Sequence, residues 1–324
     1  MKMEMSDNWV INTHSLSKSY KDVEALKSLD LKVAKNSIFG FLGPNGAGKT
    51  TTIKLLLGLI RPTSGGGSVF GHDILRDNVE IRKRIGYLAQ NPSYYKHMTA
   101  RETLRFRARF FYTGPKDALE NRIAETLEMA GLTNKADRPI KGFSGGELQR
   151  LGIAQAQVNH PDLLILDEPA ANLDPGGRRD VLEVMERLRK YTTIFYSTHI
   201  LDDVQQVSDT VAILNHGELV AQAPMEELLA GNDGTIYTVV MEGDPSGAQA
   251  RVTRREWVSS IDTTSMNGRI TWRVHVTDEE VAKSDLLRLI LADEDIKVIE
   301  FGRKQYELEE VFLRIVEGEE NVQY

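Results

Sequence analysis

Several features that would indicate an exported or membrane-spanning protein are missing from this sequence. The 324-residue chain has no cysteine, which excludes disulfide bonds and thiolate metal sites and fits a reducing compartment. Its N-terminus, MKMEMSDNWV, lacks the apolar core of a signal peptide. The longest aliphatic runs, such as LLIL at 163–166, fall far short of the about 20 residues that span a bilayer. We therefore expect a soluble chain that reaches a membrane only through a partner.

An excess of basic residues is missing as well. The chain has 40 Lys and Arg against 47 Asp and Glu, a net charge of −7. Proteins that bind nucleic acid usually present a basic surface, so no nucleic-acid partner is expected. Hydrophobic residues make up 41% and charged residues 27%, as in globular proteins, and the length allows two or three domains.

Hydrophobic periodicity predicts an α/β core over residues 10–230. Alternation at 10–33 predicts antiparallel strands, and 91–160 is mostly helical, with Thr99 and Glu102 forming a capping-box pattern. The remaining predicted elements alternate, which favours a mostly parallel sheet: strands at 37–43, 163–166 and 192–198, and helices at 49–60 and 176–190.

A second domain is predicted beyond the turn-rich segment AGNDG at 230–234, which we interpret as a linker. Residues 235–324 have the order strand, strand, helix, strand, helix. This order indicates a small α+β domain with a ferredoxin-like sheet, and we expect it to be an accessory or regulatory domain.

The octapeptide GPNGAGKT between a predicted strand and a predicted helix matches the phosphate-binding loop G-x-x-x-x-G-K-[ST]. Its glycines let backbone N–H groups wrap phosphates, Lys49 can reach the β- and γ-phosphates, and the Thr50 hydroxyl can bind Mg²⁺. The flanking elements argue against an ordinary glycine turn. The predicted ATP-binding residues here are Gly43, Pro44, Asn45, Gly46, Ala47, Gly48, Lys49, Thr50 and Thr51.

Two acidic residues follow the apolar run in LLILDEP. Asp167 emerges at the carboxyl end of a buried strand, the edge of an α/β sheet where ligands bind. We predict that Asp167 is a Mg²⁺ ligand, directly or through water, and that the neighbouring Glu168 deprotonates the attacking water.

A second glycine pair, in FSGGELQR, looks like half a phosphate site. Ser144, Gly145 and Gly146 are small and precede a predicted helix, whose N-terminus attracts anions. No lysine follows these glycines, so this segment cannot complete a phosphate loop by itself.

The motifs GPNGAGKT, YLAQNP, FSGGELQR, LLILDEP, NLD and STH stand in an order that resembles the nucleotide-binding subunit of an ABC transporter, over about residues 10–230. The resemblance implies a P-loop NTPase core with an N-terminal antiparallel β subdomain and a helical signature subdomain. It also implies that Tyr20 stacks on adenine, that Gln90 contacts Mg²⁺ and the water, and that His199 contacts the γ-phosphate. The implied catalytic set is Glu168, His199, Lys49 and Gln90, and the implied metal set is Thr50, Gln90 and Asp167.

The same resemblance explains the half-site. In this family ATP lies between two subunits arranged head to tail, and the signature loop of one, here Ser144–Gly146, covers the γ-phosphate held by the other. Asp174 would lie in the loop that joins the two sites. We expect a homodimer that serves a separate transmembrane permease subunit, with Gln90 linking to it, on the cytoplasmic face of the cell membrane.

The C-terminal segment YELEEVFLRIV resembles the tail of drug and antibiotic exporter ATPases, which favours export. The alternatives are an importer ATPase, a soluble ABC ATPase of DNA repair or translation, and a subunit that only binds ATP. The helix around RETLRFRARF is interpreted as a solvated face, with a partner-facing surface as the alternative.

Two positions depart from the family pattern. Glu147 replaces the Gln that often follows the signature glycines, and its charge could weaken attraction to ATP if it faces the phosphates. The segment AANLD lacks the small Ser-Gly pair common before LD. Neither change removes a catalytic group, so hydrolysis is still expected.

Overall fold

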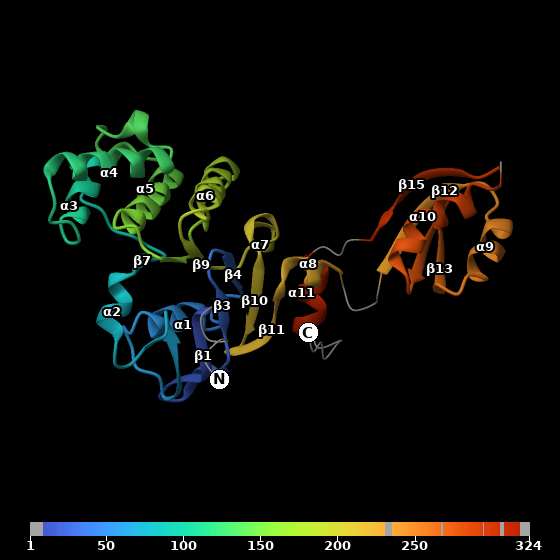
Figure 1. Cartoon of the computed structure of the whole chain (residues 1–324), viewed down its shortest axis with the longest axis horizontal. Coiled ribbons are helices and arrows are strands. Elements are labelled where there is room, and N and C mark those ends of the chain that lie inside the picture. The colour runs from blue at the N-terminus through green and yellow to red at the C-terminus, as the bar shows by residue number, and fades with distance from the viewer. Residues whose placement is uncertain (1–8, 231–234, 267, 294, 305–307, 318–324) are drawn as a thin grey trace, which may run out of the picture. The chain divides into compact units, whose positions relative to one another are not determined.

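The computed structural model describes residues 9–230, 235–266, 268–293, 295–304 and 308–317. Two compact units make up the chain: one runs to Met225 and takes up again at Ile315, and the other is Glu226–Arg314 (Figure 1). Most of the predicted linker, 231–234, lies outside the described residues.

The first unit is built on a sheet with the order β11-β10-β4-β9-β8-β7 among the described residues. All neighbours are parallel except β10 and β11. Strands β4, β8 and β9 are buried along their whole length, as expected for a parallel sheet covered on both faces. The strands are β4 (Ile38–Leu42), β7 (Ile85–Leu88), β8 (Leu163–Asp167), β9 (Thr193–Thr198), β10 (Thr210–Asn215) and β11 (Glu218–Pro224).

An antiparallel sheet comes from the N-terminal part of the chain. Its long strand β1 pairs antiparallel with β2, β3 and β5, which confirms the expected β subdomain. The strands are β1 (Trp9–Tyr20), β2 (Val23–Leu29), β3 (Lys32–Ala34), β5 (Ser64–Val69) and β6 (His72–Asp73).

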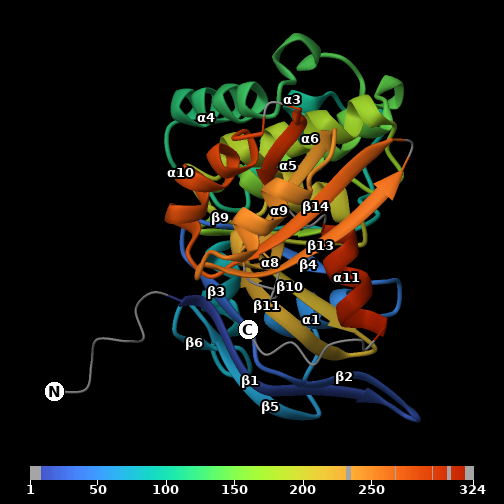
Figure 2. The ribbon, with the colours of Figure 1, turned by 90° about the vertical axis from the view of Figure 1, so that its right-hand side faces the viewer.

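The helical subdomain has a core of its own, which includes Leu104, Ile123 and Leu151. Thr99 and Glu102 form the predicted capping box at its first helix. Within this unit the subdomain and the antiparallel sheet lie at opposite ends (Figure 1, Figure 2). Its elements are α3 (Ala100–Ala108), α4 (Lys116–Met129), α5 (Gly145–Gln157) and two 3₁₀ turns, Thr133–Lys135 and Ile140–Gly142.

The other helices of this unit connect the strands of the two sheets. The predicted helix at 49–60 is shorter than expected, because α1 ends at Leu56 and Gly58 follows with a left-handed φ of 62°. These helices are α1 (Lys49–Leu56), α2 (Asn78–Lys83), α6 (Pro175–Leu188) and α7 (Leu201–Val207), while α8 (Met225–Ala230) follows β11 at the boundary between the two units.

The second unit is an antiparallel sheet with the order β13-β14-β12-β15 and two helices, the ferredoxin-like arrangement. Its core contains Trp272, Val239 and Leu286, each fully buried. The sequence pattern missed α9 and β13 in this unit. The elements are β12 (Thr235–Glu242), α9 (Ser246–Thr253), β13 (Val258–Met266), β14 (Arg269–Val276), α10 (Glu279–Ile290) and β15 (Lys297–Arg303), followed in the chain by α11 (Leu308–Glu317).

The parallel sheet positions the predicted motifs. Strands β4, β8 and β9 are adjacent and parallel, so their carboxyl ends meet at one edge. The phosphate loop follows β4, Glu168 follows β8 and His199 follows β9. In the described part of the chain, no helix is both long and apolar enough to cross a bilayer.

Separate cores predict that the first unit folds without the second. Among the described residues, the hydrophobic cluster of the second unit runs from Tyr237 to Phe301, and none of its members belongs to the clusters of the first. A chain that stops after Ala230 lacks the second unit and also the return of the first unit from Ile315. It should remain folded and bind ATP, as measured by thermal unfolding with and without nucleotide. If the shortened chain aggregates or its melting temperature does not respond to ATP, while the full-length chain is folded and responds, the first unit does not fold independently.

Candidate nucleotide site

The phosphate loop is fixed by close backbone packing at two of its glycines. A Cβ at Gly43 would lie 2.3 Å from the Leu214 carbonyl oxygen, and one at Gly48 would lie 2.5 Å from the Ala25 carbonyl oxygen. Gly48 also has a φ of 108°, a conformation that side chains disfavour. The loop is therefore pinned against β10 and β2 immediately before α1 begins.

A cavity of about 220 Å³ lies at the N-terminus of α1. A helix N-terminus preceded by a glycine-rich loop presents unpaired N–H groups to anions. Every predicted loop residue except Gly43 lines this cavity, and so do Gln90 and Glu168. The lining residues are Ala25, Pro44, Asn45, Gly46, Ala47, Gly48, Lys49, Thr50, Thr51, Gln90 and Glu168.

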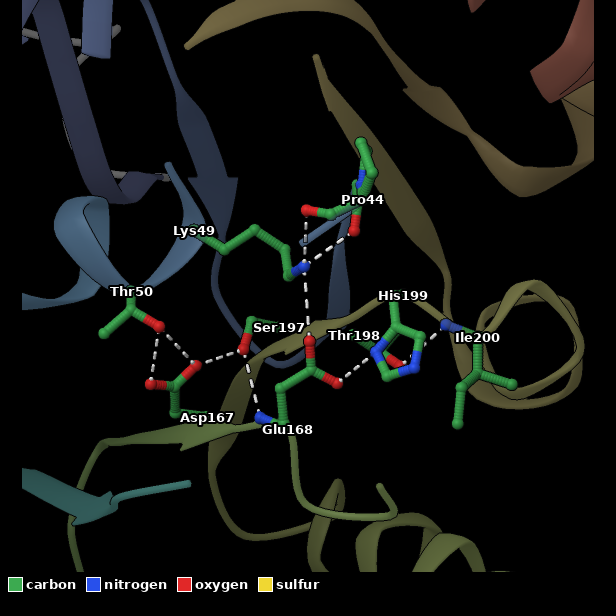
Figure 3. Close-up of polar contacts among 10 residues, drawn as sticks. Pro44, Lys49, Thr50, Asp167, Glu168, Ser197, Thr198, His199 and Ile200 are labelled. Atoms are coloured by element: carbon green, nitrogen blue, oxygen red, sulfur yellow. Dashed lines mark hydrogen bonds and ion pairs between the residues drawn. The ribbon is translucent and has the colours of Figure 1, made fainter. Parts of the chain in front are cut away.

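The Lys49 ammonium group joins the loop to the end of β8. Its Nζ donates to the carbonyl oxygens of Gly43 at 2.6 Å and Pro44 at 3.2 Å, and lies 3.2 Å from Glu168 Oε1 (Figure 3). The side chains of Lys49 and Glu168 are only 6% and 4% exposed. Each charge is thus paired, which buried charges require.

Asp167 is held from two sides. The Thr50 hydroxyl lies 3.0 Å from Oδ2, and the Ser197 hydroxyl donates to Oδ1 at 2.6 Å (Figure 3). A hydroxyl and a carboxylate placed side by side at a phosphate loop are hard oxygen donors of the kind Mg²⁺ prefers. Thr50 and Asp167 therefore fit the predicted metal, with Gln90 on the wall of the same cavity.

Two residues hold Glu168 in place. Ser197 of β9 binds its backbone, and His199, which follows β9, contacts its carboxylate. The φ of Glu168 is 51°, uncommon for a residue with a side chain, and its N–H donates to the Ser197 carbonyl at 3.1 Å and lies 3.0 Å from the Ser197 hydroxyl. Glu168 Oε2 lies 2.9 Å from His199 Nδ1 (Figure 3). The carboxylate consequently lies between a lysine and an imidazole and has one defined orientation.

The signature residues form the start of α5. Ser144 is the N-cap, and Ser144 and Gly145 are exposed, whereas none of the signature residues lines the cavity at the phosphate loop. A Cβ on Gly146 would lie 2.9 Å from the Cα of Gly177, so α5 and α6 begin in contact. The signature therefore lies beside the loop that carries Asp174, the N-cap of α6.

Comparison with known proteins agrees with this geometry. The family model described as ABC transporter matches residues 26–171. The daunorubicin/doxorubicin resistance ATP-binding protein DrrA of Streptomyces peucetius is 34% identical over 94% of this chain and 92% of its own length. The chain belongs to the ABC transporter ATP-binding proteins.

Two further relatives extend the comparison of this ABC ATPase. The bacitracin transport ATP-binding protein BcrA of Bacillus licheniformis is 41% identical, over 69% of this chain and 72% of that protein. Among solved structures, the dimeric post-hydrolysis state of the ATP-binding cassette MJ0796 bound to ADP and Pi has a TM-score of 0.60 and 25% identity. That match covers 66% of this chain and 98% of the cassette.

The two departures of this ABC ATPase from the family pattern have local explanations. Glu147 does not reach outward from α5: its Oε2 accepts from the Ser144 N–H at 3.0 Å, and its Oε1 pairs with Lys135. In AANLD, Asn172 has a φ of 59°, and Asn tolerates this left-handed conformation better than most residues. The turn thus keeps its shape without glycine.

Tyr20 and Asp174 are among the predicted residues that do not line the cavity. Tyr20 ends β1, is 45% exposed and does not line the cavity; the Lys18 ammonium lies 4.9 Å from its ring centroid. Asp174 makes no capping hydrogen bond with its side chain, so its carboxylate is not committed to α6. Adenine stacking by Tyr20 and site coupling by Asp174 stay predictions.

Sequence reasoning missed Ser197, although the residue stands in the STH motif. Its hydroxyl is the bridge between Asp167 and the Glu168 backbone, and it is fully buried. The signal that could have found it is register, because Asp167 and Ser197 are partners across β8 and β9.

Removing this hydroxyl should impair the site. Ser197→Ala leaves a buried carboxylate oxygen and an N–H without this partner, which costs about 1–3 kcal/mol, and we expect roughly tenfold slower ATP hydrolysis because two site residues lose their anchor. The matched control is Ser208→Ala, which removes a hydroxyl bonded to Tyr196 at 2.8 Å outside the site. If the two variants hydrolyse ATP at the same rate and lose the same melting temperature, Ser197 has no specific role in the site.

Proposed function

We propose that this chain hydrolyses ATP and uses the energy to drive a separate transmembrane subunit that exports a drug, an antibiotic or a lipid-like compound. The observation that carries the proposal is the Glu168 carboxylate, held beside the phosphate loop between Lys49 and His199. Export is supported by two relatives, one named for daunorubicin/doxorubicin resistance and the other for bacitracin transport.

ATP binding would redistribute the charges around Lys49. The triphosphate carries more negative charge than Glu168, so it competes for the ammonium group that now pairs with that carboxylate. N–H groups of the loop and of the first turn of α1 would hold the phosphates. Glu168 would then be released from its cation while keeping its contact with His199.

The released carboxylate has the chemistry of a general base. It can accept a proton from a water whose oxygen attacks the γ-phosphorus, while the bond from that phosphorus to the bridging oxygen breaks and ADP leaves. His199 fixes Glu168 Oε2, which leaves Oε1, the atom near Lys49, to face the water. Mg²⁺ held by Thr50, Asp167 and Gln90 would neutralise charge on the β- and γ-phosphates.

Two copies would be needed for a complete site. Ser144 and Gly145 of the signature are exposed, and no signature residue lines this chain's own cavity, so the segment suits an ATP molecule held by a second copy. The related cassette MJ0796 is dimeric in its post-hydrolysis state, which supports the arrangement. ATP would bind the closed pair more tightly than the open one, and hydrolysis would reopen it.

A second cavity, of about 310 Å³, supports the proposal of a membrane partner. It is lined by Ala89 and Pro92, which stand on either side of Gln90 in the chain, and by Gly152 and Gln155 of α5. Exposed aromatic rings border it: Tyr95, Phe106 and Phe110 are 62%, 46% and 67% exposed. Large exposed aromatics around a groove suit an apolar partner segment, here one from the transmembrane subunit at the inner face of the membrane.

The arginines of α3 divide between a solvated face and a partner-facing surface. Arg101 pairs with Asp137 at 2.7 Å and Arg105 with Glu120 at 2.5 Å, so both serve the helical subdomain itself. Arg107 instead lines the aromatic cavity, which favours a partner-facing role for that residue.

Removing the Lys49 ammonium should abolish most turnover. Lys49→Ala deletes the charge that binds phosphate in both the ground state and the transition state, and we expect a loss of about 10²-fold or more in ATP hydrolysis. The control is Lys54→Ala, an exposed lysine on the same helix. Phosphate release measured on purified protein distinguishes them, and near-parental turnover of Lys49→Ala would refute the site.

Glu168→Gln should separate ATP binding from hydrolysis. It removes the base but keeps the size, so ATP should still bind and hold two copies together, because the step that reopens them is slow. Light scattering after size exclusion should show a monomer without nucleotide and a larger dimer fraction with ATP. Ser144→Arg added to this variant should abolish the dimer and preserve ATP binding by the monomer.

A Glu168→Gln chain that stays monomeric at high protein and ATP concentrations would contradict the homodimer. A heterodimer, or a requirement for the membrane subunit, would then replace it.

A further inference from the structure

The signature helix of this chain carries a negative charge close to the residues that would contact the ATP of the other copy. Glu147 is the third residue of α5, directly after the signature glycines. In the proposed dimer the residues just before it, Ser144 and Gly145, contact the γ-phosphate. A carboxylate beside a phosphate costs affinity, because like charges brought together at an interface repel. The arrangement therefore needs a compensating cation.

Lys135 supplies this cation from a different element. It ends the 3₁₀ turn Thr133–Lys135 and pairs with Glu147 Oε1. Leu132 and Ala136, the residues on either side of this turn, are buried in the core of the helical subdomain. The lysine backbone is thus anchored by packing, and the ammonium group is placed at Glu147 by the fold.

The other carboxylate oxygen of Glu147 completes a capping box. Oε2 accepts from the Ser144 N–H at 3.0 Å, and the Glu147 N–H donates to the Ser144 hydroxyl oxygen at 3.3 Å. In this geometry the Ser144 hydroxyl accepts a bond and keeps its own proton for another acceptor. The capping box therefore fixes Ser144 while leaving it able to donate to a phosphate.

Glu147 is ionised in this environment. Burial alone would raise its pKa, but the bonds from Lys135 and Ser144 outweigh burial and hold the pKa below its usual value. Its side chain is only 9% exposed, so solvent screens the charge weakly. Lys135, which contacts the carboxylate, is consequently its main neutralising cation, and the charge of Arg138 adds to it.

We propose that Lys135 is a positioning residue for ATP-driven dimerisation, which it permits by cancelling the charge of Glu147 and holding that side chain in the capping box of the signature helix. The inference rests on the proposed two-copy site and adds a residue that does not touch the nucleotide. Without Lys135, the Glu147 carboxylate loses the cation that contacts it, keeps only the charge of Arg138 nearby, and repels the γ-phosphate of the other copy's ATP.

The test uses the full-length Glu168→Gln chain, whose ATP-induced dimer is measured by light scattering at fixed protein concentration. Adding Lys135→Ala should raise the ATP concentration for half-dimerisation by roughly fivefold or more, through like-charge repulsion. Adding Glu147→Gln to that variant should restore the parental value within about twofold, since an amide keeps the capping bond and carries no charge. ATP affinity of the monomer should stay constant throughout.

Lys141→Ala is the matched control, because this exposed lysine lies in the same subdomain and carries the same charge. The proposal is overturned if Lys135→Ala dimerises like its parent, if Lys141→Ala weakens the dimer equally, or if Glu147→Gln fails to restore it. The last result would show that Lys135 acts through folding. Each of these outcomes leaves the two-copy site intact, whereas a Glu168→Gln parent without any dimer contradicts the two-copy site itself.

Discussion

Buried charges must be paired, and in this protein that constraint organises the nucleotide site. Lys49 and Glu168 are nearly inaccessible to solvent and lie on different segments, one after β4 and one after β8. Their ion pair ties the phosphate loop to the catalytic edge of the sheet, and Ser197 adds the third segment, β9. A ligand that takes Lys49 from Glu168 would therefore free the proposed base from its counter-ion as the phosphates arrive.

The same constraint operates at the signature. Glu147 is tolerated at the start of α5 because Lys135 and the Ser144 N–H satisfy it. Both ends of the proposed two-copy site thus hold a carboxylate against a lysine. In the proposed cycle, Lys49 leaves Glu168 for the phosphates when ATP binds, whereas Lys135 stays paired with Glu147.

Local motifs made much of the site predictable. The phosphate loop follows β4, and Asp167 and Glu168 stand at the end of β8. Both strands are short and buried, and their apolar runs are contiguous in sequence, so the positions of these residues in the fold could be predicted. Ser197 could not be singled out, since its role depends on the register between β8 and β9. Lys135 was equally invisible, because only the folded helical subdomain places it at Glu147.

The fold shows the same division. The α/β core was predicted from strong periodicity, whereas β13 escaped because it is an edge strand with mostly exposed residues on both faces, which leaves no apolar alternation. α9 escaped for a related reason: it has eight residues and buries only Ala248 and Val252. Elements that bury few apolar residues show no clear hydrophobic periodicity in the sequence, so they are hard to predict.

The central claim is that one ATP site takes its two halves from two chains. Mixing two inactive variants tests it most directly: Lys49→Ala, which keeps its signature, and Ser144→Arg, which keeps its phosphate loop. A mixed pair contains one intact site, so ATP hydrolysis should appear in the mixture at a level that neither variant reaches alone. A mixture no more active than the sum of its separate components would contradict a site shared between two copies.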